Sequence, residues 1–452
     1  MKIIIAGAGE IGSHLAKMLS GASNDITVID SDEERLKNIS SSADIVVVEG
    51  SPSSPDVLKE AGADKADLFI AVYPSHSQDV NVLSAILAKK MGSKKVTARI
   101  NNEEYLSYDK KYIFTEMGID LLFYPEKIAA GEIMDLLSHT AATDSMDFAH
   151  GKLQLAVFKI DEDSPVIDQT LKDFAADSHT GAESFRVVAV SRGSTTFIPK
   201  SDTRFKYRDL VFIIARREAL DSLMNYLGKS STTVSSVMIM GGSPIAAMLA
   251  RDLSKKGLEV KIIDSDIEKC RTLAERLGEN VTVVHGDGRN SELLSDEDIT
   301  SYDAFVALTD RSETNILACA AAKKAGVART IAQVENLEYI SLAEGMGVDA
   351  VINKKLITAG RIFKFTLSDK VRFIKYMSGT SAEIIEFITA PGSRITKAPL
   401  KDLDFPEGCI IGGVIRGSEA FIAVGDTLIQ PYDRVAVFAM PDAVREVDRW
   451  FR

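Results

Sequence analysis

Residues 2–30 decide the fold of this chain, and they read KIIIAGAGEIGSHLAKMLSGASNDITVID. The run 2–6 is rich in β-branched residues and predicts a buried strand, and a turn of the pattern G-x-G-x-x-G follows at once from Gly7. Apolar residues then recur at helical spacing, and the run 25–30 predicts a second strand that ends in an aspartate. Strand, turn, helix, strand and acid stand in the order of a dinucleotide-binding unit.

The glycines of this turn are the residues that a bound nucleotide requires. Gly7 allows the tight turn, Gly9 lets the backbone approach a pyrophosphate, and Gly12 allows close packing of helix on strand. Phosphates would lie on the free N–H groups at the positive end of the helix dipole. Asp30 would accept hydrogen bonds from a ribose 2′-hydroxyl and repel a 2′-phosphate. The stretch therefore favours NAD or an adenosine nucleotide over NADP, and a glycine-rich turn without a ligand is the alternative.

The composition predicts a soluble globular protein of several domains. At 452 residues the chain is too long for one core, and we expect about three or four domains. The net charge of −12 argues against nucleic acid or an anionic membrane surface as a direct partner. The three cysteines are scattered, which suits a reducing cytoplasm and offers no metal-ligand spacing. No apolar run approaches the roughly 18 residues of a membrane span, so we expect any action at a membrane to depend on another subunit.

Strands and helices alternate through the first part of the chain. Short connections between them imply a parallel, doubly wound sheet with ligands at the carboxyl ends of its strands. The later predicted elements of this unit are strands at 45–49, 68–72, 95–100 and 119–124 and helices at 79–91 and 125–139. The following region predicts short strands at 153–160, 185–191 and 210–215 and a helix at 216–227. We therefore expect a small α+β lobe after the first parallel sheet.

The same two-part design then occurs a second time. Gly241 lies 234 residues after Gly7 (241 − 7), and Asp264 lies 234 residues after Asp30 (264 − 30). The matching pairs in the small lobes are LKDF at Leu171 with LKDL at Leu400, Asp202-Thr203 with Asp426-Thr427, and Asp209 with Asp433. The sequence therefore predicts an α/β fold of tandem Rossmann-like, doubly wound parallel sheets, each followed by a small α+β C-terminal lobe. The expected domains are 1–140, 141–228, 237–366 and 367–452, with a linker at 228–236.

The second copy departs from the ideal turn. Ser243 stands where the middle glycine would be and adds a Cβ where a pyrophosphate would approach. The copy nevertheless retains Asp264 and carries two polar loops at predicted strand ends, GDGRNSELL with Asp287 and ALTDRSETN with Thr309 and Asp310. We expect its site to be degraded at the turn but still polar at the strand ends.

The first copy differs in the same loops. It has Ser51 at the place of Asp287, and its other loop, AVYPSHSQDVN, is two residues longer and begins its polar part with Tyr73. Arg99 ends the fifth predicted strand, where its guanidinium could reach a phosphate or form a surface ion pair, and the second copy has Gln333 there. The two copies could therefore prefer different nucleotides.

Taken together, these motifs resemble the TrkA family, the cytoplasmic regulatory proteins of Trk potassium-uptake systems with tandem RCK domains. The resemblance covers essentially all 452 residues and rests on GAGEIG with Asp30, VEGSP and ARIN in the first copy, and on HGDG and ALTDRSETN in the second. It implies that the protein is not an enzyme and binds NAD, NADH or the adenine nucleotides ATP and ADP. It also implies a homotetramer in the cytoplasm, held at the inner face of the cell membrane by a membrane-embedded, TrkH-like potassium transporter.

The resemblance further implies which residues contact the nucleotide. In the first copy they are Gly7, Gly9, Glu10, Ile11, Gly12, Asp30, Gly50, Ser51 and Arg99. In the second copy they are Gly241, Ser243, Asp264, Asp287, Thr309 and Asp310.

Two nucleotide clefts on one chain without a catalytic set of residues predict a sensor. A nucleotide acts on a distant pore only if it binds one arrangement of the domains more tightly than another. We expect phosphates at the first cleft to alter the packing of neighbouring Rossmann units and the width of a ring. Because Asp30 ends a strand, we expect it to have no core role, so that Asp30→Ala weakens binding without unfolding. The alternatives are an NAD-dependent oxidoreductase with duplicated Rossmann units, for which the sequence offers no convincing acid or base, and a scaffold with vestigial turns.

Overall fold

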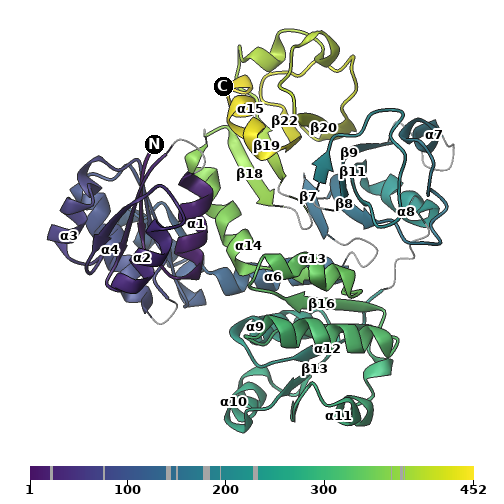
Figure 1. The fold of residues 1–452 in the computed structure, drawn as a ribbon, viewed down its shortest axis with the longest axis horizontal. Helices are drawn as coiled ribbons and strands as arrows, with labels where there is room; N and C mark the ends of the chain where they lie inside the picture. Colours follow the sequence, from purple (N-terminus) through teal and green to yellow (C-terminus); the bar gives the residue numbers. More distant parts are fainter. Residues whose placement is uncertain are drawn as a thin grey trace. The chain divides into compact units, whose positions relative to one another are not determined.

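The computed structural model places most of the chain in two compact units (Figure 1). It describes residues 1–20, 24–74, 77–138, 144–148, 151–176, 184–193, 195–227, 233–367, 369–376, 380 and 382–452. Part of the expected linker, residues 228–232, lies outside the described residues. The first unit comprises residues 1–129 with 354–367, and the second comprises residues 130–353 with 368–452.

The first unit is built on a six-stranded parallel sheet. Its strands follow the order β3-β2-β1-β4-β5-β6, which is the doubly wound order of a Rossmann fold. They are β1 (Lys2–Ala6), β2 (Asp25–Asp30), β3 (Val46–Glu49), β4 (Leu68–Ala71), β5 (Lys95–Arg99) and β6 (Leu121–Phe123). The helices are α1 (Glu10–Ser20), α2 (Glu33–Ser40), α3 (Pro55–Glu60), α4 (Gln78–Met91), α5 (Lys111–Glu116) and α14 (Lys354–Phe363). The predicted parallel sheet is confirmed, and the order reverses at β1, where such a fold binds its ligand.

Helix α14 comes from the far end of the second repeat, yet it packs against α1 of the first. The buried residues of α14 include Ala359, Gly360 and Ile362. Sequence spacing alone gives no sign of this long-range exchange, because the helical pattern shows which face is buried but not against what.

The second unit contains the repeat of the parallel sheet. Its strand order β14-β13-β12-β15-β16-β17 matches the first sheet position by position. The strands are β12 (Ser236–Met240), β13 (Glu259–Asp264), β14 (Val281–His285), β15 (Ala304–Ala307), β16 (Arg329–Gln333) and β17 (Ala350–Ile352). The helices around them are α9 (Pro244–Lys255), α10 (Ile267–Leu277), α11 (Ser291–Asp296), α12 (Ser312–Lys324) and α13 (Glu338–Gly345). Helix α6 (Pro125–Ser138) follows the first sheet and crosses the sequence boundary between the two units.

The two small lobes are five-stranded antiparallel sheets, both in the second unit. The first, of order β10-β9-β11-β8-β7, comprises β7 (Asp144–Phe148), β8 (Leu153–Lys159), β9 (Phe185–Arg192), β10 (Thr195–Phe197) and β11 (Leu210–Arg216), with α7 (Leu171–Ala176) and α8 (Arg217–Tyr226). The second, of order β18-β19-β22-β20-β21, comprises β18 (Val371–Tyr376), β19 (Glu383–Ile388), β20 (Cys409–Arg416), β21 (Glu419–Ile422) and β22 (Arg434–Ala439), with α15 (Val444–Trp450). One apolar cluster contains buried residues of both lobes, and in it the ring centroids of Phe212 and Phe438 lie 5.8 Å apart.

Paired hydrogen bonds confirm the repeat of the lobes. Arg192 forms a two-pronged ion pair with buried Asp209, and Arg416 forms the same pair with buried Asp433. Such a guanidinium–carboxylate pair fixes the strand-end turn in one geometry. The predicted α+β lobes therefore share local contacts as well as sequence motifs.

Candidate functional site

The carboxyl ends of the central strands form the same kind of edge in both sheets. In the first sheet Ala6 pairs with Ile29 of β2 and with Ala71 of β4. In the second sheet Met240 has the equivalent pairings to β13 and β15. In this fold the crevice outside that edge is where ligands bind.

Two glycines of the first turn are required by the fold itself. Gly7 has φ +114°, and a Cβ there would lie 2.9 Å from the backbone nitrogen of Tyr73. A Cβ at Gly12 would lie 1.8 Å from the carbonyl oxygen of Gly7. Gly9 is different, because a Cβ there would meet nothing within 4 Å. Packing thus requires glycine at positions 7 and 12 but does not require it at position 9.

The two residues after Gly9 have structural contacts. Glu10 begins α1 and is exposed, with its carboxylate 3.7 Å from Lys355 Nζ of α14. Ile11 is buried in the core of the unit. The contacts of both side chains are with the protein itself, so a role of Glu10 and Ile11 in nucleotide binding stays a prediction.

Asp30 holds the glycine turn together. Its Oδ2 accepts a hydrogen bond from Ala8 N at 2.6 Å, and its Oδ1 accepts one from Asp32 N at 3.0 Å. The side chain is 1% exposed. The expectation that Asp30 has no core role was wrong, because the end of a strand here lies beneath the turn and not in solvent. Each carboxylate oxygen has a second lone pair, so a ribose contact stays chemically open to it.

Tyr73 reaches across the first edge. Its hydroxyl accepts a hydrogen bond from Ser31 N at 3.0 Å, so the side chain runs from the end of β4 to the residue after β2. Burial raises the pKa of the Tyr73 phenol, and the negative charge of Asp30 adds to the shift.

Arg99 is held by an ion pair and is mostly out of solvent. Its Nη2 donates to Glu126 Oε1 at 2.9 Å, and the two side chains are only 11% and 10% exposed. Burial first, and then the charge of Glu126, raise the pKa of neighbouring Tyr124 to about 12. Of the two roles left open for Arg99, the structure shows an ion pair, but a buried one that fixes the start of α6.

The loop after β3 completes the first edge. Gly50 has φ +148°, and a Cβ there would lie 2.6 Å from Val57. The Ser51 hydroxyl lies 2.8 Å from that of Ser53. This loop of the first copy therefore carries the Ser51 hydroxyl at the place where the second copy carries the charged Asp287.

The second turn has the same glycine conformation and aspartate contacts as the first, but its serine caps the following helix. Gly241 has φ +101°, and Asp264 accepts hydrogen bonds from Gly242 N at 2.5 Å and from Asp266 N at 2.8 Å. Ser243 caps α9, because its Oγ accepts from Ala246 N at 3.3 Å. The turn therefore retains the acid but gives one of its free N–H groups to its own serine.

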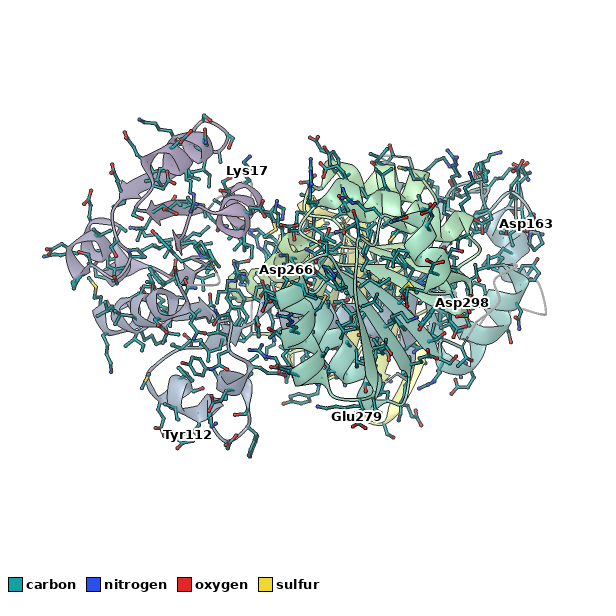
Figure 2. All side chains as sticks on the ribbon, turned by 90° about the horizontal axis from the view of Figure 1, so that it is seen from below. Lys17, Tyr112, Asp163, Asp266, Glu279 and Asp298 are labelled. Carbon is teal, nitrogen blue, oxygen red and sulfur yellow. The ribbon has the colours of Figure 1, made fainter. Side chains whose placement is uncertain are left out.

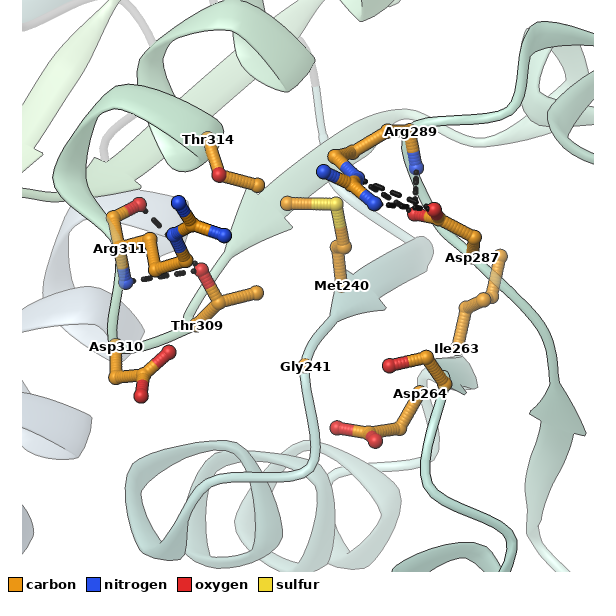
Figure 3. A pocket seen from close by; sticks show the side chains of 12 residues that line it. Met240, Gly241, Ile263, Asp264, Asp287, Arg289, Thr309, Asp310, Arg311 and Thr314 are labelled. Atoms are coloured by element: carbon orange, nitrogen blue, oxygen red, sulfur yellow. Dashed lines mark hydrogen bonds and ion pairs between the residues drawn. The ribbon is translucent and has the colours of Figure 1, made fainter.

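A cavity of about 180 Å³ opens at this second edge. It is lined by Met240, Gly241, Ile263, Asp264, Ser265, Asp287, Gly288, Arg289, Thr309, Asp310, Arg311 and Thr314. Arg289 donates to Asp287 through Nε to Oδ1 and through Nη2 to Oδ2, and these hydrogen bonds lower the pKa of Asp287 to about 2. Figure 3 shows Arg289 and Arg311 on the two sides of Met240. The structure thus brings together five predicted second-copy residues, Gly241, Asp264, Asp287, Thr309 and Asp310, in one concave site, and the sixth, Ser243, is not part of the lining.

Arg311 is the cation at this site without a counter-ion. It is exposed, and across the described residues its guanidinium has no hydrogen-bond or ion-pair partner. Sequence reasoning named the loops that contain Arg289 and Arg311 but neither arginine. The signal was present, since each arginine lies two residues after a predicted strand-end site residue, Asp287 or Thr309.

Other kinds of site find no support in the part of the chain that the structure describes. No group of three or more histidine, cysteine, aspartate or glutamate side chains there could hold a metal ion. Over the same residues, no helix combines the length and apolar character needed to cross a membrane.

Known proteins share this arrangement along the whole chain. The TrkA-N domain model matches residues 3–125 and again 237–354, and the TrkA-C domain model matches residues 155–228 and 384–452. Trk system potassium uptake protein TrkA homolog 1 of Methanosarcina mazei is 32% identical over 460 residues and covers 100% of both chains. Trk system potassium uptake protein TrkA of Halomonas elongata is 32% identical over 457 residues, covering 100% of this chain and 99% of its own. The fold is similar to that of the GsuK channel bound to NAD, with a TM-score of 0.60, 16% identity, and coverage of 100% of this chain and 78% of that one.

Proposed function

The chain belongs to the TrkA family, whose members are regulatory subunits of potassium uptake and not enzymes, and from this premise we propose that it senses a nucleotide in its second cleft. The family assignment removes the oxidoreductase alternative. The observation that carries the proposal is the open cavity in which Asp264 and the unpaired Arg311 lie together.

The chemistry of the cavity fits a nucleotide with at least two phosphates. Asp264 has lone pairs left for a ribose hydroxyl after its two bonds to the turn. Arg311 would bind a phosphate through charge-assisted hydrogen bonds, and Arg289 could join it if it left Asp287. Because the related fold of the GsuK channel was solved bound to NAD, we propose NAD or NADH as the ligand, with ATP and ADP as further candidates.

The proposal moves the main site from the first cleft to the second. In the first cleft Asp30 is buried under the turn and Arg99 is paired with Glu126. In the second cleft the acid and a free cation both line the cavity. The role of Gly241, Asp287, Thr309 and Asp310 as further contacts is part of this proposal.

Arg311→Ala should weaken nucleotide binding without changing stability. A hydrogen bond to a charged group contributes about 1.5–3 kcal/mol, which corresponds to roughly a 10- to 100-fold loss of affinity. Isothermal titration with NAD, NADH, ATP and ADP measures the change. Arg276→Ala, an exposed arginine of α10 outside the cavity, is the matched control and should bind as the natural chain does. Equal affinity in the two variants would contradict the role of Arg311.

To pass a nucleotide signal to a transporter, several copies of the chain must assemble. Exposed apolar side chains at equivalent places in the two copies suggest the surface through which they do so. In both copies large apolar residues are exposed at matching places on, or directly after, the helices that follow the fourth and fifth strands. The pairs are Leu83 with Leu317, Ile113 with Leu342, and Met117 with Met346. Tyr112 also extends from α5 at the surface (Figure 2). Because these helices follow successive crossovers in one direction, they share one face of each sheet. We propose that these two faces join copies of the chain into a tetramer.

Leu317→Glu should therefore reduce the oligomer to smaller species. The substitution places a charge in a surface whose burial excludes water, which penalises association by several kcal/mol. Light scattering after size-exclusion chromatography gives the mass. Arg276→Glu adds the same side chain on α10, away from α12, and should leave the mass unchanged. If the Leu317→Glu variant had the same oligomer mass as the natural chain, the proposed surface would be wrong.

The regulatory role is tested in vesicles that contain the membrane-embedded potassium transporter. We expect potassium flux with the chain present to change when NADH is added, and Arg311→Ala to shift that response to higher NADH concentrations. A ligand can act in this way only through different affinities for two domain arrangements. A flux that is indifferent to nucleotide at concentrations that saturate the cavity would refute the sensor.

A further inference from the structure

The two clefts share the same asparagine hydrogen bonds to the backbone but differ in the side chain at the equivalent position. Asn81 accepts from Tyr73 N through Oδ1 and donates to the carbonyl oxygens of Tyr73 and Arg99. Asn315 forms the same three bonds with Thr309 N, Thr309 O and Gln333 O. Tyr73 and Thr309 are therefore equivalent positions, although the loop of the first copy is two residues longer.

The residues that Tyr73 joins correspond to walls of the second cavity. Ser31 and Ser265 each lie two residues beyond the pairing partner of the central strand, Ile29 or Ile263. Thr309 and Ser265 both line the open cavity of the second copy. In the first copy the equivalent pair, Tyr73 and Ser31, is bridged by a hydrogen bond at 3.0 Å.

This bridge has to cross the end of β1. Strands β2 and β4 lie on either side of β1, two strand spacings or about 10 Å apart. A side chain that starts after β4 and bonds to the backbone after β2 therefore passes over the glycine turn at Gly7. The phenol ring takes the space that a nucleotide would need in that crevice.

We propose that Tyr73 is the specificity-determining residue of the first cleft, whose side chain excludes nucleotide there and leaves the second cleft as the binding site. The proposal rests on the proposed nucleotide function and adds how the two copies divide it. Thr309 is too short to make the same bridge and bonds to Asn315 instead, so the second cleft stays open. A nucleotide enters the first cleft only if Tyr73 gives up its bond to Ser31 N and turns away.

The test is the number of NADH molecules bound per full-length chain in isothermal titration. We expect about one per chain for the natural protein and about two for Tyr73→Thr, which copies the second cleft. Tyr73→Phe keeps the ring and loses only the hydroxyl, and it should stay at about one. Adding Arg311→Ala to Tyr73→Thr should leave the new site and weaken the old one by roughly 10- to 100-fold. Two sites in the natural chain, or one in Tyr73→Thr, would overturn the proposal.

Hydrogen exchange of the natural chain gives a second measurement that requires no substitution. NADH should protect amides of the second edge around Ser265 and Arg311 and leave those around Ser31 and Tyr73 unchanged. Protection at Ser31 would overturn the role of Tyr73 even if the threonine variant did not fold. Absence of NADH binding in every variant would refute the nucleotide function itself, which is a different outcome from a wrong count of sites.

Discussion

Gly12→Ala is expected to unfold the first parallel sheet under conditions where the natural chain is stable. The added Cβ would lie 1.8 Å from the carbonyl oxygen of Gly7, a backbone atom that cannot move without opening the turn. Overpacking in a well-packed core costs about 1–3 kcal/mol, and a clash with backbone belongs at or above the upper end. Hydrogen exchange of the β1 amides during urea unfolding measures the loss for this unit alone.

Gly9→Ala is the matched control for that experiment. Its Cβ would meet nothing within 4 Å, so we expect stability within about 0.5 kcal/mol of the natural chain. If Gly12→Ala were as stable as Gly9→Ala, the close contact of helix and turn that we describe would be wrong.

Asp30→Ala is expected to destabilise the first unit by about 3 kcal/mol. The substitution leaves Ala8 N and Asp32 N without their acceptor, and a buried unsatisfied group costs about 1–3 kcal/mol. The urea midpoint of the first unit should fall accordingly. This result differs from the sequence-based expectation, in which the change affects binding alone.

Asp25→Ala provides the comparison for Asp30, because Asp25 begins the same strand and is exposed. We expect a change within about 0.5 kcal/mol for this variant. An Asp30→Ala protein as stable as Asp25→Ala would show that the carboxylate does not hold the turn.

The sequence predicts the frame of the molecule well because local patterns determine it. Strands 2–6 and 25–30 were expected at the bounds where β1 and β2 occur, since each is a short apolar run limited by turn residues. The 234-residue repeat between Gly7 and Gly241 predicted the second sheet in the same way, and the strand orders of the two sheets agree.

Side-chain partners escaped prediction because they depend on three-dimensional contacts. Tyr73 was noted as a departure, but its bond to Ser31 depends on the sheet order that sets β2 and β4 on either side of β1. The sequence leaves open whether Arg99 binds a phosphate or forms an ion pair, because its partner Glu126 lies 27 residues further along the chain. Arg311 lies in a predicted loop, yet only the three-dimensional structure shows that it lines the same cavity as Asp264.

The most direct test of the central claim is a cryo-electron microscopy structure of the full chain in saturating NADH. We predict nucleotide density in the second cleft, with the adenosine ribose within hydrogen-bond distance of Asp264 and a phosphate at Arg311, and Tyr73 still bonded to Ser31. Nucleotide in the first cleft, whether or not the second is filled, or no nucleotide in either cleft, would contradict the account.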